Sequence, residues 1–329
     1  MNSVFKQEIN SFLELMKQSY SKNTYIHIKS TMNLFDKWLI DDNHLDKTVN
    51  LEIINGFIKS SKGKRRTINE HINHINKFLV FLSSLGYSVS YHEKIKELSD
   101  YIPYYFTDDD IEDIFDKCDN FIILGKPYNL KSKLIHIEIP MAARIMYGCG
   151  ARIGETLSLK VNDIDFENGV IRFTHDTKNN KQRLVPIHNT LTNIIKRYCE
   201  ALSIINQKDA FLFPLNLLFK EHITVKSVSS MFREHILKDI RSNQNLERHQ
   251  RGACVHQFRH TFALRSFRQF ELNGYKPKNM VPILSTYLGH DSLNETEKYL
   301  RFSYLLYPEA NDAFEEFTCD ILPEVNFDE

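Results

Sequence analysis

The chain has 329 residues, 42% of them hydrophobic, and its 42 basic side chains balance its 42 acidic ones. This length suggests about two domains of roughly 100 to 200 residues each, and the hydrophobic content excludes global disorder. No run reaches the roughly 18 apolar residues of a membrane helix, and residues 1–10 lack a secretory signal. We therefore expect a cytoplasmic protein without a membrane partner. The five cysteines are scattered and form no C-x-x-C pair, which argues against disulfides or a zinc site.

The neutral total hides an uneven distribution of charge. Residues 151–300 carry 22 basic and 15 acidic groups, whereas residues 301–329 carry one and eight. Such an asymmetry suggests a polyanionic partner for the basic region, and a solvated or docking role for the acidic tail.

Residues 1–97 are expected to form a helical domain. Apolar residues recur at intervals of three and four over 12–16, 26–39 and 68–82, which places them on one face of each helix. Ser21 can cap the second of these helices, and Gly86 can end the last one.

A cluster of cations lies between the second and third of these patterns. Clustered cations suit contacts to DNA phosphates, although an ordinary solvated loop has the same composition. The candidates for DNA binding are Lys62, Lys64, Arg65 and Arg66.

A linker is expected at residues 98–106, where Pro103 interrupts the helical pattern, followed by a second domain at 107–304 and an acidic tail at 305–329. Thr107 precedes three aspartates, a good helix start, because its hydroxyl can cap free amides and carboxylates favour the positive end of the helix dipole. Helices then continue to about Tyr147.

The hydrophobic period changes in the middle of the second domain. Residues 164–166 and 170–173 flank Asn168-Gly169, a pair that favours a type I′ hairpin turn, and a third strand is expected at 183–187. The sequence therefore predicts a mainly α protein with a small antiparallel sheet, in which a helical domain is followed by an α+β domain. Further helices are expected at 191–202, 225–237, 256–270 and 278–288.

Several common chemistries have no motif here. The chain lacks the glycine-rich loops that bind nucleotides, the H-E-x-x-H zinc motif and the G-x-S-x-G nucleophile motif. His71 and His74 are spaced for one helix face, but no third ligand lies nearby. We expect neither a metal nor a cofactor.

What remains is a set of cations, histidines and one tyrosine, each weak as a signal by itself. Taken in order within their flanking residues, they resemble the tyrosine recombinase (phage integrase) family, and most closely its Xer-like members. Four segments carry the resemblance: YGCGARIGETLSLKVNDIDF, TKNNKQRLVPI, HQFRHTFA and LGHDSLNETEKYL. The segments before residue 97 also resemble that family's helical core-binding domain. The matching positions are Arg152, Lys178, His256, Arg259, His290 and Tyr299.

The resemblance implies a role for each position. Tyr299 is the nucleophile that forms a 3′-phosphotyrosyl bond, and His256 is the base that removes its proton. Arg152 and Arg259 bind the phosphate oxygens, His290 adds a donor, and Lys178 protonates the departing 5′ oxygen.

Other residues near these positions have different expected roles. Glu155 orients an active-site side chain, or else is a plain surface glutamate. The rival tyrosines Tyr287, Tyr304 and Tyr307 do not fit the spacing from Gly289-His290.

Three features depart from the family pattern. The 31 residues from Arg259 to His290 form a long connection, Ala151 and Phe258 replace leucines, and the acidic tail is not fixed by the family. We expect Phe314, Phe317 and Ile321 in that tail to pack on a neighbouring subunit.

The resemblance implies a site-specific DNA recombinase that acts on a double-stranded recombination site, assembles as a synaptic tetramer and can require a second recombinase. Because helices begin almost at Met1, no additional arm-binding domain is expected, which favours an Xer-like recombinase. We expect it to come from an integrative or transposable element. Alternatives are a housekeeping chromosome-resolution recombinase, a topoisomerase of the same mechanism, a helical protein adaptor, and a catalytically silent DNA-binding protein on the same scaffold.

Overall fold

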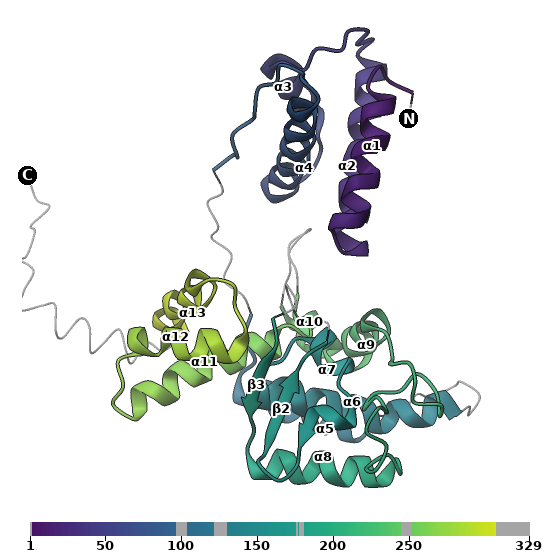
Figure 1. The fold of residues 1–329 in the computed structure, drawn as a ribbon. Coiled ribbons are helices and arrows are strands. Elements are labelled where there is room, and N and C mark those ends of the chain that lie inside the picture. Colours follow the sequence, from purple (N-terminus) through teal and green to yellow (C-terminus); the bar gives the residue numbers. More distant parts are fainter. Residues whose placement is uncertain are drawn as a thin grey trace, which may run out of the picture. The chain divides into compact units, whose positions relative to one another are not determined.

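The structure of the chain is a computed structural model. The chain forms two compact units, Met1–Tyr101 and Ile102–Glu329 (Figure 1). No helix in the described part of the chain is long and apolar enough to cross a membrane. Residues 98–103 of the expected linker and residues 307–329 of the expected tail lie outside the described ranges. These ranges are 2–96, 104–121, 130–175, 177, 181–244 and 252–306.

The amino-terminal unit is helical, as predicted. Aromatic side chains fill its core, where the ring of Phe78 packs against Phe12 at 5.3 Å between centroids and against Phe35 at 6.3 Å. The Ser21 side chain accepts a hydrogen bond from the Thr24 amide, which confirms the predicted cap. The helices are α1 (Lys6–Ser19), α2 (Lys22–Asp41), α3 (Leu51–Ser60) and α4 (Arg65–Ser84).

Helix α3 was not predicted, although the sequence contains its signals. The Asn50 side chain caps it by accepting from the Ile53 amide. Ile54, Phe57 and Ile58 then bury one face at helical spacing. The helix has only ten residues, so its periodic pattern is short.

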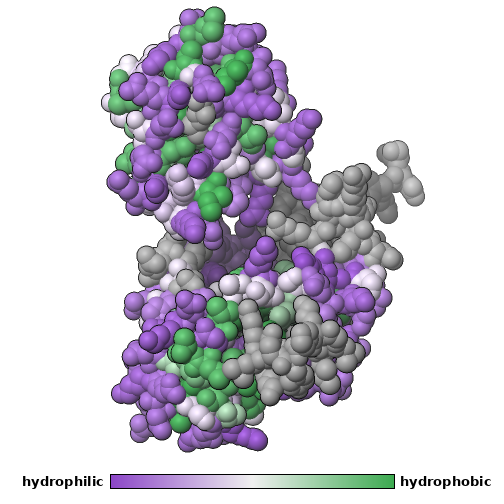
Figure 2. All heavy atoms as spheres, turned by 90° about the vertical axis from the view of Figure 1, so that its right-hand side faces the viewer, coloured by the Kyte–Doolittle hydropathy of each residue, from purple (hydrophilic) through white to green (hydrophobic). Residues whose placement is uncertain are grey.

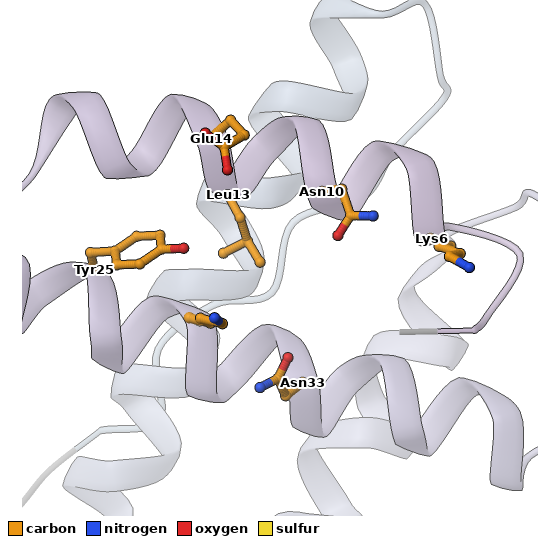
Figure 3. A pocket seen from close by; sticks show the side chains of 7 residues that line it. Lys6, Asn10, Leu13, Glu14, Tyr25 and Asn33 are labelled. Carbon is orange, nitrogen blue, oxygen red and sulfur yellow. The ribbon is translucent and has the colours of Figure 1, made fainter.

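The surface of this unit is largely polar. On the face seen in Figure 2, hydrophilic residues dominate and hydrophobic side chains emerge in separate places. A pocket of about 560 Å³ lies between α1 and α2, with Lys6, Leu13 and Tyr25 among its lining residues (Figure 3). The residues predicted for catalysis are all in the other unit.

The carboxy-terminal unit contains helices and a three-stranded antiparallel sheet in the order β1-β2-β3. The predicted fold class is therefore confirmed. Thr107 caps the first helix, as its sequence indicated, and it also forms a reciprocal capping box with Asp110. The elements are α5 (Asp108–Asp119), α6 (Leu130–Cys149), α7 (Ile153–Leu157), β1 (Ile164–Asp165), β2 (Val170–Phe173), β3 (Arg183–Pro186), α8 (Asn189–Ala201), α9 (Val225–Met231), α10 (Lys238–Asn243), α11 (Gln257–Leu272), α12 (Pro277–Leu288) and α13 (Leu293–Leu306).

The first hairpin forms, but its predicted turn type is wrong. Asp165 pairs with Val170, so four residues form the turn, and Gly169 has a φ of 62° whereas Asn168 is not among the residues with positive φ. A type I′ turn needs positive φ at both central positions. The Asp165 carboxylate instead stabilises a longer turn, accepting from the amides of Glu167 and Asn168 and from the Asn168 side chain.

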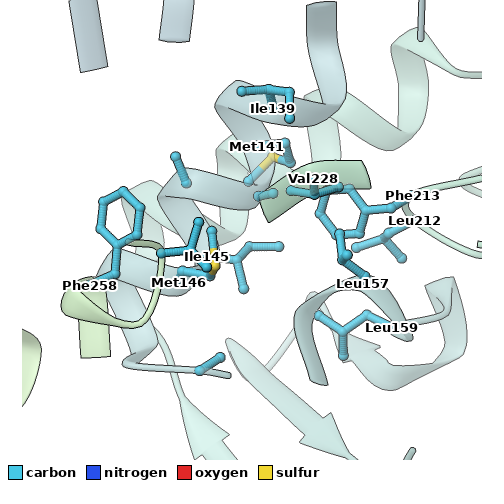
Figure 4. Close-up of a cluster of buried hydrophobic side chains, with 14 of the residues drawn as sticks. Ile139, Met141, Ile145, Met146, Leu157, Leu159, Leu212, Phe213, Val228 and Phe258 are labelled. Atoms are coloured by element: carbon cyan, nitrogen blue, oxygen red, sulfur yellow. The ribbon is translucent and has the colours of Figure 1, made fainter. Parts of the chain in front are cut away.

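Two hydrophobic clusters place the elements that carry the predicted site. The larger one joins α6, α7 and the segment around Phe213, with Ile145, Leu157 and Phe258 among its fully buried members (Figure 4). The smaller one packs α11, α12 and α13 together and includes Leu288 and Tyr299. Burial of this apolar surface fixes the ends of these helices relative to one another.

Candidate active site

Arg152 lies at the N-terminal cap of α7, where its backbone and side chain both contact Glu155. Its backbone amide donates to Glu155 Oε2 over 2.9 Å, and its Nη1 donates to Oε1 over 2.8 Å. Its Nη2 reaches the carbonyl of Gly289 at 3.4 Å. The turn before it needs Gly150, whose φ is 59° and whose added Cβ would lie 2.6 Å from Phe262.

Arg259 is almost completely buried, with 1% of its surface exposed. Its Nη1 donates to the carbonyl of Gly150 over 2.9 Å, and its Nη2 donates to the carbonyl of Leu288 over 2.7 Å. Burial and the nearby Arg152 charge lower the pKa of Arg259 to about 10, so it stays protonated at neutral pH. Both predicted arginines thus reach the end of α12.

Glu155 is fully buried and accepts hydrogen bonds from a second arginine besides Arg152. Arg183, from β3, donates from Nη1 and Nη2 to its two oxygens over 3.0 and 2.8 Å. Burial alone would raise the pKa of Glu155, but the hydrogen bonds and charges of Arg183 and Arg152 hold it below its ordinary value. The surface alternative for Glu155 is excluded, and the orienting role agrees with these contacts.

Tyr299 lies on α13 with 6% of its surface exposed. Its hydroxyl is 2.8 Å from Nδ1 of His260, and its ring stacks at 13° on that of His290 with 6.2 Å between centroids. Burial raises the pKa of the Tyr299 phenol, and the charges of Arg259 and Arg152 partly offset this.

Two histidines, His260 and His290, contact this tyrosine, and a third, His256, contacts His260. His256 directly precedes α11 and is partly exposed to solvent. Desolvation by the surrounding protein, followed by the charges of Arg259 and Arg152, nevertheless lowers its pKa to about 4. Burial, followed by the charges of neighbouring groups, lowers the pKa of His260 to about 3. Both imidazoles are therefore neutral at neutral pH, and their rings meet edge to face at 4.6 Å.

His290 follows Gly289, which ends α12 in the left-handed conformation with a φ of 66°. Its Nδ1 lies 2.6 Å from the hydroxyl of Thr296, a completely buried residue at the start of α13. This contact orients the ring that stacks on Tyr299.

Lys178 lies outside the described residues, so its predicted position is not tested. Two side chains just beyond that turn connect to the α12 end. Lys181 forms an ion pair of 3.1 Å with Asp291, and Arg183 donates from Nε to the carbonyl of Tyr287 over 2.9 Å.

Five of the six predicted catalytic residues therefore lie together where the starts of α7 and α11, the end of α12 and the middle of α13 meet. Sequence reasoning missed the roles of His260, Arg183 and Thr296. The adjacent H-x-x-R-H pattern was a signal for His260, whereas a single arginine on a strand is not a signal for Arg183. Within the described ranges, no group of three or more His, Cys, Asp or Glu side chains is placed to hold a metal ion.

The remaining candidates lie elsewhere. Tyr287 donates its hydroxyl to the carbonyl of Pro186 over 3.2 Å and packs with Phe262. Tyr307 and the side chain of Tyr304 are outside the described part of the chain. The predicted DNA-binding cations are exposed around the start of α4, where Arg65 is the first helical residue.

Comparison with known proteins gives a family and a fold that agree with this structure and its candidate site. The Phage integrase family matches residues 104–304, more than half of the chain, so the chain belongs to this family. A putative integrase/recombinase of Sinorhizobium fredii is 30% identical over 168 residues, which cover 49% of this chain and 50% of that protein. The chain thus spans about half the length of the first curated relatives it matches.

Solved structures share the fold across almost the whole chain. The XerH site-specific recombinase bound to a palindromic difH substrate superposes with a TM-score of 0.66 at 16% identity, covering 94% of this chain and 95% of that one. A lambda integrase tetramer bound to a Holliday junction gives a TM-score of 0.61 at 16% identity, covering 91% and 78%. At this identity the likeness shows the fold.

Proposed function

We propose that the chain is a site-specific DNA recombinase that cleaves and rejoins DNA strands through a 3′-phosphotyrosyl intermediate. The observation that carries the proposal is the placement of the Tyr299 hydroxyl at His260, in a site with the buried guanidinium of Arg259 and the half-buried one of Arg152. A phenol next to preorganised cations suits attack on a phosphodiester, because the bond energy of the phosphate is kept in the covalent intermediate.

The two arginines answer the charge problem of this reaction. The phosphodiester is negative before attack, and negative charge grows on its non-bridging oxygens in the pentacoordinate transition state. Arg152 and Arg259 keep permanent charges and are held by carbonyls and Glu155, so they need little reorganisation when that charge develops.

Two further residues complete the proposed chemistry. His290 adds a hydrogen bond to the phosphate, and Lys178 protonates the departing 5′ oxygen. The role of His256 as base for Tyr299 stays a prediction, because no hydrogen bond among the described residues joins the two side chains. Each step is a displacement at phosphorus with proton transfer, so the reaction requires no cofactor.

The proposed substrate is a double-stranded recombination site, held by a helical core-binding domain over 1–97 and a catalytic domain over 107–304. Exposed cations at the start of α4 support phosphate contacts, and the likeness to DNA-bound relatives in fold supports the same arrangement. Assembly as a synaptic tetramer, exchange of the tail 305–329, a second recombinase and residence in a mobile element belong to this proposal.

A selection from nicked suicide duplexes tests the activity and recovers the DNA site in one experiment. The protein is incubated with a pool of nicked duplexes of randomised sequence, and covalent protein–DNA adducts are isolated and sequenced. We expect a recurrent sequence in the adducts, and none with Tyr299→Phe, which should still bind DNA without covalent attachment.

Tyr287→Phe provides the matched control, since it removes a phenol from the same unit without touching the proposed nucleophile. It should form adducts like the natural chain. Binding without any adduct in the natural chain would instead support the catalytically silent DNA-binding protein.

A further inference from the structure

His260 and Tyr299 are joined directly although they are 39 positions apart in sequence. His260 lies on α11, one residue after the phosphate-binding arginine, and Tyr299 lies on α13. Their Nδ1 and hydroxyl atoms are 2.8 Å apart, and the centroids of their rings 5.5 Å. Within the described ranges, this is the one hydrogen bond of the Tyr299 hydroxyl.

The other two histidines of the site are engaged differently. His290 stacks on the face of the Tyr299 ring and directs its Nδ1 to Thr296, 2.6 Å away. His256 meets the His260 ring rather than the tyrosine. Thus His260 has the geometry that a proton acceptor needs, a ring nitrogen within hydrogen-bond distance of the proton it removes.

We propose that His260 is a further catalytic residue, the group that receives the proton of Tyr299. The proposal rests on the recombinase activity proposed above and assigns one step of it. His260 thus takes the role of base that the resemblance gave to His256. His256 is left to contact the bound phosphate together with the two arginines.

The step balances as an acid–base pair. As the Tyr299 oxygen forms its bond to the scissile phosphorus, its proton moves to Nδ1 of His260, whose Nε2 already carries one, giving an imidazolium. The bond from phosphorus to the 5′ oxygen breaks, and that oxygen takes a proton from Lys178. Rejoining reverses each transfer, so His260 returns the proton to the tyrosine.

The charges around His260 restrict this transfer to the DNA-bound state. His256, Arg259, His290 and Tyr299 surround its ring, and burial with the positive charges among these groups keeps it neutral in the free protein. A bound phosphodiester adds a negative charge that neutralises the guanidiniums and favours the imidazolium. The phenol therefore keeps its proton until a phosphate is in place.

The decisive experiment changes the acidity of the nucleophile. Single-turnover cleavage is measured on the nicked duplex recovered by selection, using protein with tyrosine or the more acidic 3-fluorotyrosine at position 299. We expect His260→Asn, which keeps a polar atom near Nδ1 but accepts no proton, to slow cleavage by about 100-fold. With 3-fluorotyrosine this loss should shrink, because a more acidic phenol depends less on a base.

His256→Asn is the matched comparison, and its loss should be the same with either tyrosine. An equal loss for His260→Asn with both nucleophiles, or a shrinking loss for His256→Asn instead, would overturn the proposal. If the natural chain cleaves normally in these assays, such a result removes the role of His260 and leaves the recombinase activity intact. Absence of cleavage in the natural chain would remove the proposed function itself.

A second measurement does not depend on activity or on the folding of a variant. Nitrogen NMR of labelled histidine in the natural chain reports which ring nitrogen of His260 carries the proton. We expect the proton on Nε2, which leaves Nδ1 free to accept from Tyr299. A proton on Nδ1 would make His260 a donor to the phenol oxygen and would contradict the inference.

Discussion

Arg183 and Glu155 form a buried two-pronged ion pair, in which Nη1 and Nη2 donate to Oε1 and Oε2 over 3.0 and 2.8 Å. The same guanidinium donates from Nε to the carbonyl of Tyr287 and lies over the ring of Phe173, 4.5 Å from its centroid. One side chain of β3 thus ties the helix behind Arg152 to the helix that precedes His290. Glu155 passes this constraint to Arg152 through its own two hydrogen bonds.

Loss of one member of this pair should be costly. Arg183→Met leaves the Glu155 carboxylate buried with reduced compensation, and we expect the free energy of unfolding to fall by about 3–5 kcal/mol, measured by urea denaturation. Adding Glu155→Gln to Arg183→Met removes the stranded charge and should restore part of the loss. Additive losses in the double variant would contradict a direct pair.

The same pair predicts a pH dependence of stability. The pKa of Glu155 in the folded chain is lowered from its ordinary value of 4.5. The stabilisation that the ionised Glu155 gives to the folded state is therefore complete above pH 4.5 and is lost as the pH falls through the lowered folded value. Arg183→Met should reduce this part of the acid-induced loss. The free energy of unfolding of both proteins is measured from neutral pH to below pH 4. If it falls in parallel in the natural chain and in Arg183→Met, the pair does not cause this part of the pH dependence.

Local sequence signals predicted most of the fold because the elements depend on neighbouring residues. Thr107 with its three aspartates indicated the start of α5, and the apolar periods indicated most of the other helices, although α3 and α13 were not predicted. The hairpin turn failed because the side chain of Asp165 supplies hydrogen bonds that an Asn-Gly pattern does not reveal.

The site required a different kind of information. Motif order brought out Arg152, Arg259 and Tyr299, but not the partner of the tyrosine hydroxyl, since His256 and His260 lie one helical turn apart and only packing of α11 on α13 decides between them. Arg183 was missed for the same reason, because its partners are distant in sequence.

Gly289 should be intolerant of a side chain. Any L-residue there pays roughly 1–2 kcal/mol for the left-handed conformation. A Cβ would also lie 3.1 Å from Cδ and 3.2 Å from Nη1 of Arg183. We expect Gly289→Ala to lose more stability than Gly274→Ala, whose φ is also positive at 79° but whose Cβ would meet no atom within 4 Å. Equal losses in thermal unfolding would show that Arg183 moves aside without cost.

Glu138 is expected to destabilise the fold at neutral pH. It is 2% exposed, its Oε1 has no hydrogen-bond partner among the described residues, and burial raises its pKa to about 8. Because the folded value exceeds the unfolded one, the destabilisation by Glu138 is absent below about pH 4.5 and grows as the pH rises towards 8.

Glu138→Met should remove this fall and raise the free energy of unfolding by about 3 kcal/mol at pH 7, measured by urea denaturation across the pH range. Glu112→Met, at an exposed position of α5, is the control and should leave the pH dependence of stability unchanged. A natural chain whose stability is flat between pH 5 and 8 would mean that Glu138 keeps its ordinary acidity.

The cations at the start of α4 should set part of the salt dependence of DNA binding. Arg65 and Arg66 are exposed in the first turn of this helix, where free backbone amides add to their attraction for phosphate. Each phosphate contact contributes about 0.9 to the slope of log affinity against log salt. Replacing both by Gln should therefore reduce the slope by about 2 and weaken binding to all sequences alike.

The measurement uses Tyr299→Phe protein and duplexes of random sequence, so that cleavage does not enter. The matched control replaces Lys196 and Arg197 by Gln, which removes the same charge from two neighbouring exposed positions of α8. If net charge alone governed binding, both double variants would reduce the slope equally. A larger effect at α4 would locate phosphate contacts there, and an equal or smaller one would assign that segment to the ordinary solvated surface.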